Sequence, residues 1–100
     1  MTNHWKDIKN TDVVLVMGAN PAENHPCGFK WALEARDERG AQILTVDPRY
    51  TRTSAVADHH LQIRPGSDIA VLGGMIHKIL DEGLFHEEYV RLHTNASFIV

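Results

Sequence analysis

Three short apolar segments of this 100-residue chain each run directly into a loop of polar residues and turn formers. They cover about residues 12–18, 42–46 and 59–63. The first is a continuous apolar run, which is typical of a parallel strand that is buried on both faces. In open α/β sheets, ligands bind beyond the carboxyl ends of the strands, where successive loops meet. The three segments therefore predict a parallel sheet with a candidate nucleotide site along one edge.

Helical patterns separate these strands. A helix is predicted from Pro26, which suits a first helical turn, to about Arg39, with Gly40 as its left-handed terminator. Thr51 or Thr53 is expected to cap a short helical turn before the third strand. This order predicts the α/β class: a three-stranded parallel Rossmann-like sheet with flanking helices, part of a larger doubly wound cofactor-binding domain.

A second long helix is predicted from a Ser67 cap to about Glu82, and a short one over residues 85–92. The apolar residues of the long helix are expected to form a buried stripe: Ile69, Leu72, Ile76, Ile79 and Leu80. So small a sheet leaves apolar faces uncovered, and the last residues of the chain are themselves apolar. Residues 1–100 are therefore expected to be one partial domain of a longer protein.

The composition, with 43% hydrophobic and 23% charged residues, is that of a soluble globular domain. A net charge of -3 argues against nonspecific nucleic-acid binding, and the apolar runs are too short to span a membrane. Arg49, Arg52 and Arg64 nevertheless lie in or beside the second and third loops, where they suit one phosphorylated ligand. The single cysteine, Cys27, excludes an internal disulfide and is expected to be a packing residue.

The first loop, residues 18–25, combines a turn former with a versatile polar side chain. Gly18 allows a sharp turn, and Asn20 offers both a donor and an acceptor. Backbone N–H groups at the start of the following helix could hold a phosphate oxygen. The spacing matches neither the dinucleotide-binding glycine motif nor a Walker loop. The alternative is a polar loop that touches no ligand.

The second loop, residues 47–51, begins with the residue that points most clearly to a ligand. Asp47 ends the second strand of a β-α-β unit, where a carboxylate can accept hydrogen bonds from both hydroxyls of a ribose. Pro48 fixes the turn, and Arg49 could reach a phosphate or shield the carboxylate. The alternative is that Asp47 merely caps its turn.

The third loop, residues 64–68, ends at the start of the second long helix. Asp68 lies there beside Ser67, and the helix dipole favours a negative charge at this position. Its two oxygens could instead accept hydrogen bonds from the N1–H and N2–H₂ edge of a guanine. Both interpretations stay open.

The seven histidines do not suggest a metal site made by this chain alone. His59 and His60 point to opposite faces of their strand, and residues 86–93 lack the i, i+4 histidine pair of a zinc helix.

Taken together, the loops resemble the molybdopterin oxidoreductase superfamily, and within it the major (alpha) subunit of formate dehydrogenase. The resemblance is carried by residues 17–26 (MGANPAENHP), 46–53 (VDPRYTRT) and 64–70 (RPGSDIA), in this order. Residues 2–5 (TNHW) and 94–97 (TNAS) are similar to formate dehydrogenases in particular. The resemblance implies a bis-molybdopterin guanine dinucleotide cofactor carrying Mo or W, with these loops holding one guanine dinucleotide arm.

The resemblance also implies a role for each loop. The first would lie along the pyrophosphate, Asp47 would bind the ribose, and the third would read the guanine. The implied cofactor-binding residues are Gly18, Asn20, Ala22, Glu23, His25, Asp47, Pro48, Arg49, Thr51, Gly66, Ser67 and Asp68. It implies no catalytic and no metal-binding residue in this chain.

The parent enzyme of this resemblance oxidises formate to CO₂ and passes two electrons to iron–sulfur centres. Its catalytic selenocysteine or cysteine and its iron–sulfur cysteines have no counterpart in this sequence, so the isolated chain is expected to be inactive. The implied partners are the remainder of the catalytic subunit and an iron–sulfur electron-transfer subunit, without nucleic acid and without a direct membrane span. A respiratory parent would be periplasmic, and any other would be cytoplasmic.

Three other interpretations stay open. They are another molybdopterin oxidoreductase such as a nitrate reductase, a freestanding guanine-nucleotide-binding module, and a nonfunctional relic. The chain is expected to begin at an internal methionine, downstream of a selenocysteine codon that was read as a stop.

Overall fold

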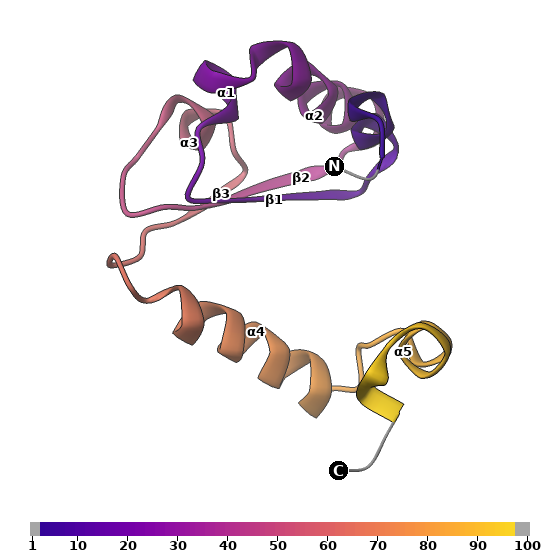
Figure 1. The fold of residues 1–100 in the computed structure, drawn as a ribbon. Helices are drawn as coiled ribbons and strands as arrows, with labels where there is room; N and C mark the ends of the chain where they lie inside the picture. The colour runs from indigo at the N-terminus through magenta and orange to yellow at the C-terminus, as the bar shows by residue number, and fades with distance from the viewer. Residues whose placement is uncertain (1–2, 98–100) are drawn as a thin grey trace. The chain divides into compact units, whose positions relative to one another are not determined.

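The computed structural model describes residues 3–97, and the chain divides into two compact units, Met1–Pro65 and Gly66–Val100 (Figure 1). The first unit contains the sheet, and the second contains helices.

The first unit is built on three parallel strands, β1 (Val13–Met17), β2 (Gln42–Val46) and β3 (His59–Leu61), in the spatial order β1-β2-β3. The predicted three-stranded parallel sheet is therefore confirmed. β3 ends two residues earlier than expected, because its partner strand leads into a proline. The N–H of Asp47 donates to the carbonyl of Leu61 (3.2 Å), and the next residue, Pro48, has no N–H to continue the ladder.

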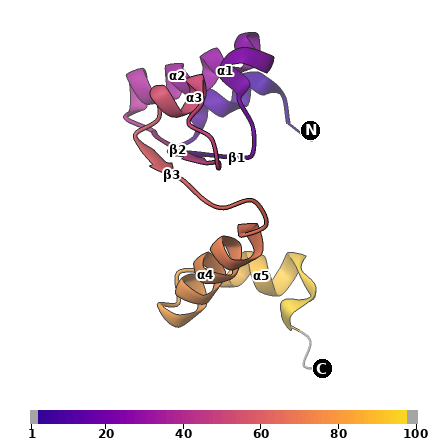
Figure 2. The ribbon, with the colours of Figure 1, turned by 90° about the vertical axis from the view of Figure 1, so that its left-hand side faces the viewer.

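Helices cover one face of this sheet (Figures 1 and 2). They are α1 (Pro21–Asn24), α2 (Pro26–Arg39), α3 (Arg52–Ala55) and the 3-10 helix η1 (Trp5–Asn10). Phe29 and Ala32 of α2 form the core with Ile43 of β2, whose side chain is fully buried. Pro26 occupies the first turn of α2, and Gly40 ends it in the left-handed conformation with φ 71°, as predicted.

Two elements of this unit were not expected from the sequence. η1 packs against the start of α2, where the ring of Trp5 lies over Gly28 and stacks on His25 at a centroid distance of 5.6 Å. α1 turns part of the first loop into a single helical turn. Both are too short to show an apolar period, so pattern analysis could not detect them.

No described helix of the first unit covers the other face of the sheet (Figure 1). Val13, Leu15 and Leu61 are 56%, 41% and 50% exposed. The expectation that the first strand is buried on both faces is therefore wrong for this structure, because the helices of the unit lie on one side only.

The second unit contains α4 (Asp68–Asp81), α5 (Glu87–His93) and the 3-10 helix η2 (Asn95–Ser97). The predicted helices are confirmed, but two details are wrong. Ser67 precedes α4 without a capping hydrogen bond from its side chain to any described residue. None of the residues of α4, all of which are described, is buried, so its apolar stripe is exposed. Two helices and one turn provide too little apolar surface to enclose such a stripe.

Candidate functional site

The first and second loops meet at the carboxyl edge of the sheet. The N–H of Gly18, just after β1, donates to the carbonyl of Val46 at the end of β2 (3.0 Å). Gly18 has φ 57°, a conformation that favours glycine, and no described atom outside its immediate neighbours lies within 4 Å of where its Cβ would be. Asp47 follows Val46 directly. The structure therefore brings the start of the first loop beside the carboxylate of the second.

Asp47 caps its own turn. Its Oδ1 accepts a hydrogen bond from the N–H of Arg49 (2.8 Å), across Pro48. The side chain of Gln62 adds a hydrogen bond to the carbonyl of Pro48 (3.1 Å). This is the turn-capping role that the sequence left open, and it uses one of the two carboxylate oxygens. Asp47 is half-buried, so its carboxylate remains accessible to a ligand. The cap fixes this carboxylate where the two loops meet.

Thr51 lies at the start of α3. It is buried and forms a capping box at the start of α3, in which Ser54 N–H donates to Thr51 Oγ1 (3.2 Å). The N–H of Thr51 donates in return to Ser54 Oγ (3.2 Å). The predicted cap is thus confirmed for Thr51, whose hydroxyl accepts a hydrogen bond from the first turn of α3.

The polar atoms of Asn20 are also engaged within the chain. Its Oδ1 accepts from the hydroxyl of Thr53 (2.8 Å), and its amide group donates to the carboxylate of Glu23. The N–H of Ala22 donates to the same Thr53 hydroxyl (3.0 Å). The sequence pattern indicates Thr53 only as a possible helix cap. The hydroxyl-rich run around it, residues 51–54, is the only signal that could have drawn attention to it.

The remaining polar side chains of the first loop, Glu23, Asn24 and His25, are exposed. Glu23 pairs with Arg52 of α3 (3.1 Å), and His25 Nδ1 lies 2.6 Å from Asn24 Oδ1. Exposed ion pairs are worth little, so a ligand could replace them at small cost.

The third loop contributes Gly66, Ser67 and Asp68 to the second unit, where Gly66 and Ser67 precede α4 and Asp68 is its first residue. Gly66 has φ 86°, and Asp68 is exposed in the first helical turn, where the dipole favours its charge.

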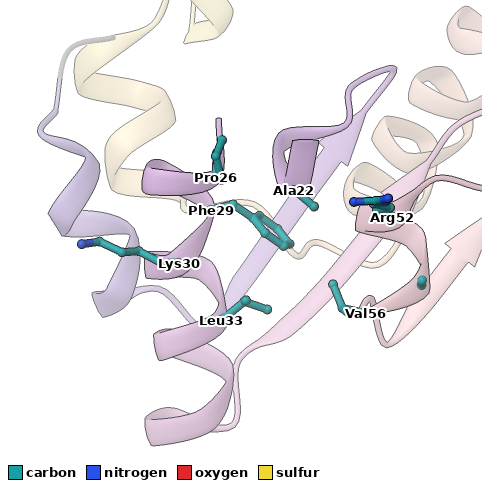
Figure 3. Close-up of a pocket in the computed structure, with 8 residues that line it drawn as sticks. Ala22, Pro26, Phe29, Lys30, Leu33, Arg52 and Val56 are labelled. Atoms are coloured by element: carbon teal, nitrogen blue, oxygen red, sulfur yellow. The ribbon is translucent and has the colours of Figure 1, made fainter. Parts of the chain in front are cut away.

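A separate groove of about 480 Å³ lies between α2, α1 and α3 (Figure 3). Phe29 points into it, whereas the amine of Lys30 points away. Its lining is mostly apolar: Ala22, Pro26, Phe29, Lys30, Leu33, Arg52, Ala55 and Val56. It shares only Ala22 with the predicted site residues, so it is not the nucleotide site that the loops suggest.

Residues with metal-binding side chains are scattered over the fold. Among residues 3–97, no group of three or more His, Cys, Asp or Glu is arranged to hold a metal ion. His60 faces the covered side of the sheet, with Nδ1 3.0 Å from Thr45 Oγ1 and its ring edge-on to Tyr50. Cys27 is exposed, so the expectation that it packs in the core is wrong. No helix in the described part of the chain is long and apolar enough to cross a membrane.

The family model and the similar proteins found by comparison agree with one another. The family described as molybdopterin oxidoreductase matches residues 1–90. Formate dehydrogenase subunit alpha of Megalodesulfovibrio gigas is 58% identical over the whole chain, and formate dehydrogenase-O major subunit of Escherichia coli (strain K12) is 54% identical. The assimilatory nitrate reductase catalytic subunit of Bacillus subtilis (strain 168) is 39% identical over 96% of the chain.

These relatives are much longer than the chain, which covers 10% of both formate dehydrogenase subunits and 13% of the nitrate reductase. Among solved structures, a mutant Sir2 homologue in complex with 2′-O-acetyl ADP ribose has a TM-score of 0.58 and 25% identity. The match covers 76% of this chain and 29% of that one.

Proposed function

The chain belongs to the molybdopterin oxidoreductase family, and we propose that it supplies one side of the site for a guanine dinucleotide arm of the molybdopterin cofactor. The observation that carries this proposal is the hydrogen bond from Gly18 to Val46, which brings the first loop beside Asp47. In open α/β sheets, this edge is where nucleotides bind.

The residues present at this edge fit such a ligand. The backbone at Gly18 is open, which suits the close approach of a phosphate group. Asp47 has one carboxylate oxygen engaged by Arg49, and the carboxylate is held where it could accept hydrogen bonds from ribose hydroxyls. The exposed Arg49 and Arg52 provide positive charge for phosphates. The hydrogen bonds of Asn20 to Thr53 and of Thr51 to Ser54 hold the loops of the proposed site in place.

We propose, on the family resemblance of their loop, that Gly66, Ser67 and Asp68 of the second unit read a guanine base. The two carboxylate oxygens of Asp68 would accept hydrogen bonds from guanine N1–H and N2–H₂, a pair of donors that adenine lacks. The Sir2 homologue is in complex with 2′-O-acetyl ADP ribose, so this structural likeness supports a nucleotide as the ligand. The choice of guanine over adenine rests on Asp68.

We further propose that the longer protein, which includes the remainder of this larger domain, oxidises formate. When bound, the cofactor supplies the metal centre, Mo or W, that takes two electrons from formate. The residues of this chain would bind and orient one of its arms and would not touch the substrate. The remainder of the catalytic subunit and an iron–sulfur electron-transfer subunit would be the partners. Formate is favoured over nitrate because the two formate dehydrogenase subunits named above are 58% and 54% identical, whereas the nitrate reductase is 39% identical, the same value as formate dehydrogenase H of Escherichia coli.

Calorimetry tests the binding role directly. GDP should bind the chain at least about ten-fold more tightly than ADP, because adenine leaves the Asp68 carboxylate without donors. Asp47→Asn should weaken both nucleotides, since it removes the charge that favours the ribose hydroxyls. Asp37→Asn is the matched control, because Asp37 is an exposed carboxylate on α2. Equal affinities for GDP and ADP, or equal effects of both variants, would contradict the proposal.

A further inference from the structure

Thr53 joins two loops that are far apart in the sequence. Its hydroxyl donates to Oδ1 of Asn20 (2.8 Å) and accepts from the N–H of Ala22 (3.0 Å). Its own N–H also donates to Asn20 Oδ1 (3.3 Å). The residue is completely buried, and these partners lie 31 and 33 residues away in the chain. The hydroxyl therefore both donates and accepts, and it does so entirely within the protein.

These contacts exchange the usual roles of a helix cap. Asn20 is the N-cap of α1, a position where its side chain would normally accept from an N–H of the first turn. It makes no such bond to any residue that the structure describes, because its Oδ1 is engaged by Thr53. The N–H of Ala22, in the first turn of α1, is satisfied instead by the Thr53 hydroxyl. The cap of α1 thus comes from α3.

The exchanged cap explains why a threonine stands at this buried position. Valine has nearly the same shape and would fill the same space, but it could neither cap α1 nor hold Asn20. The side chain is therefore needed for its hydrogen bonds rather than for packing. Since α3 follows the second loop directly, the bonds connect the first loop to the element that anchors the second.

We infer that Thr53 is a positioning residue that locks the first loop onto the second before a nucleotide binds. This inference rests on the proposed nucleotide site and adds a buried residue that acts on the site without contacting the ligand. A site whose loops are already fixed in their ligand-bound positions loses less conformational freedom when the ligand binds. Thr53 touches no ligand in this role, because it acts through Asn20 and Ala22.

Thr53→Val tests the lock without creating a cavity. Amide hydrogen exchange at Ala22 and Glu23 should accelerate about ten-fold or more, and by a larger factor than at the amides of β2. The urea midpoint should fall, because the N–H of Ala22 loses its buried partner, and GDP affinity, measured without urea on the folded variant, should fall about ten-fold. Thr53→Ser keeps the hydroxyl and should restore the exchange rates and the affinity.

Thr45→Val is the matched control. Thr45 is also buried in the first unit, and its hydroxyl bonds within the sheet, 3.0 Å from His60 Nδ1. This variant should leave the exchange of Ala22 and the affinity for GDP unchanged. If Thr53→Val does not fold, Asn20→Ala removes the other half of the lock at a less buried position. It should lower the affinity for GDP and accelerate the exchange of the Thr53 amide, which loses its acceptor.

The results separate the two proposals. Unchanged exchange at Ala22 in Thr53→Val, or at Thr53 in Asn20→Ala, would overturn the lock, as would equal effects of Thr45→Val. A wild-type chain that binds no GDP would contradict the proposed function, whereas the exchange rates would still decide whether the lock exists. Faster exchange of the first loop with unchanged GDP affinity would overturn the positioning role.

Discussion

The six-membered ring of Trp5 occupies the space that a Cβ at Gly28 would need, so only glycine fits beside it. This contact joins η1 to α2 and requires the smallest residue at the third position of the helix. It explains a glycine in a place where helix propensity alone would disfavour it.

Gly28→Ala should therefore destabilise the chain even though alanine is the better helix former. The clash with Trp5 should cost more than the roughly 1 kcal/mol gained in propensity, giving a net loss of about 1 kcal/mol by urea titration. In a Trp5→Ala background the same substitution should stabilise, because the obstacle is gone. A stabilising effect of Gly28→Ala with Trp5 present would show that the contact is not maintained in solution.

Asp58 links the start of β2 to the segment before β3. Its carboxylate accepts from the N–H of Ile43 (2.7 Å), and its own N–H donates to the carbonyl of Ile43 (2.8 Å). Asp58→Ala should lower the free energy of unfolding by about 1–2 kcal/mol, because the N–H of Ile43 loses its partner. Asp58→Asn keeps an acceptor and should cost clearly less. Equal losses in urea titrations of the two variants would argue against this hydrogen bond.

The two proposed ligand carboxylates should have separable effects. Asp68→Asn should reduce the preference for GDP over ADP by about ten-fold, because an amide cannot accept from both guanine donors. Asp47→Asn should weaken the two nucleotides equally, since the ribose is common to both. Calorimetry on the two variants decides between the roles, and a change in base preference at Asp47 alone would reverse the assignment.

The open face of the sheet should make the isolated chain self-associate. Leu15 of β1 and Leu61 of β3 are exposed there, and contiguous apolar surface of this kind drives association. Leu15→Lys combined with Leu61→Lys should shift the chain toward monomer in light scattering. Val56→Lys, an exposed apolar position at the end of α3, is the control that should not change the association. An equally large effect of the control would point to a different surface.

Much of the site could be predicted from the sequence because the roles of several residues depend only on their own turns. A glycine after a strand and an aspartate before a proline act through their own turns, and Gly18 and Asp47 are found in those turns. The side chains of Asn20 and Thr51 could not be judged in the same way. Whether a polar atom is free depends on partners elsewhere in the chain, and Thr53 and Ser54 already engage theirs.

The sequence by itself determined the order and bounds of the main elements. β2 spans Gln42–Val46 as expected, and Gly40 ends α2, because apolar runs and special backbone conformations act over a few residues. Only the tertiary structure decided which surfaces are covered and which hydrogen bonds cross the fold. Packing and long-range hydrogen bonds depend on residues brought together from distant positions, as the bond between Asn20 and Thr53 shows. Because these two residues lie far apart in the sequence, no local pattern predicts the hydrogen bond between them.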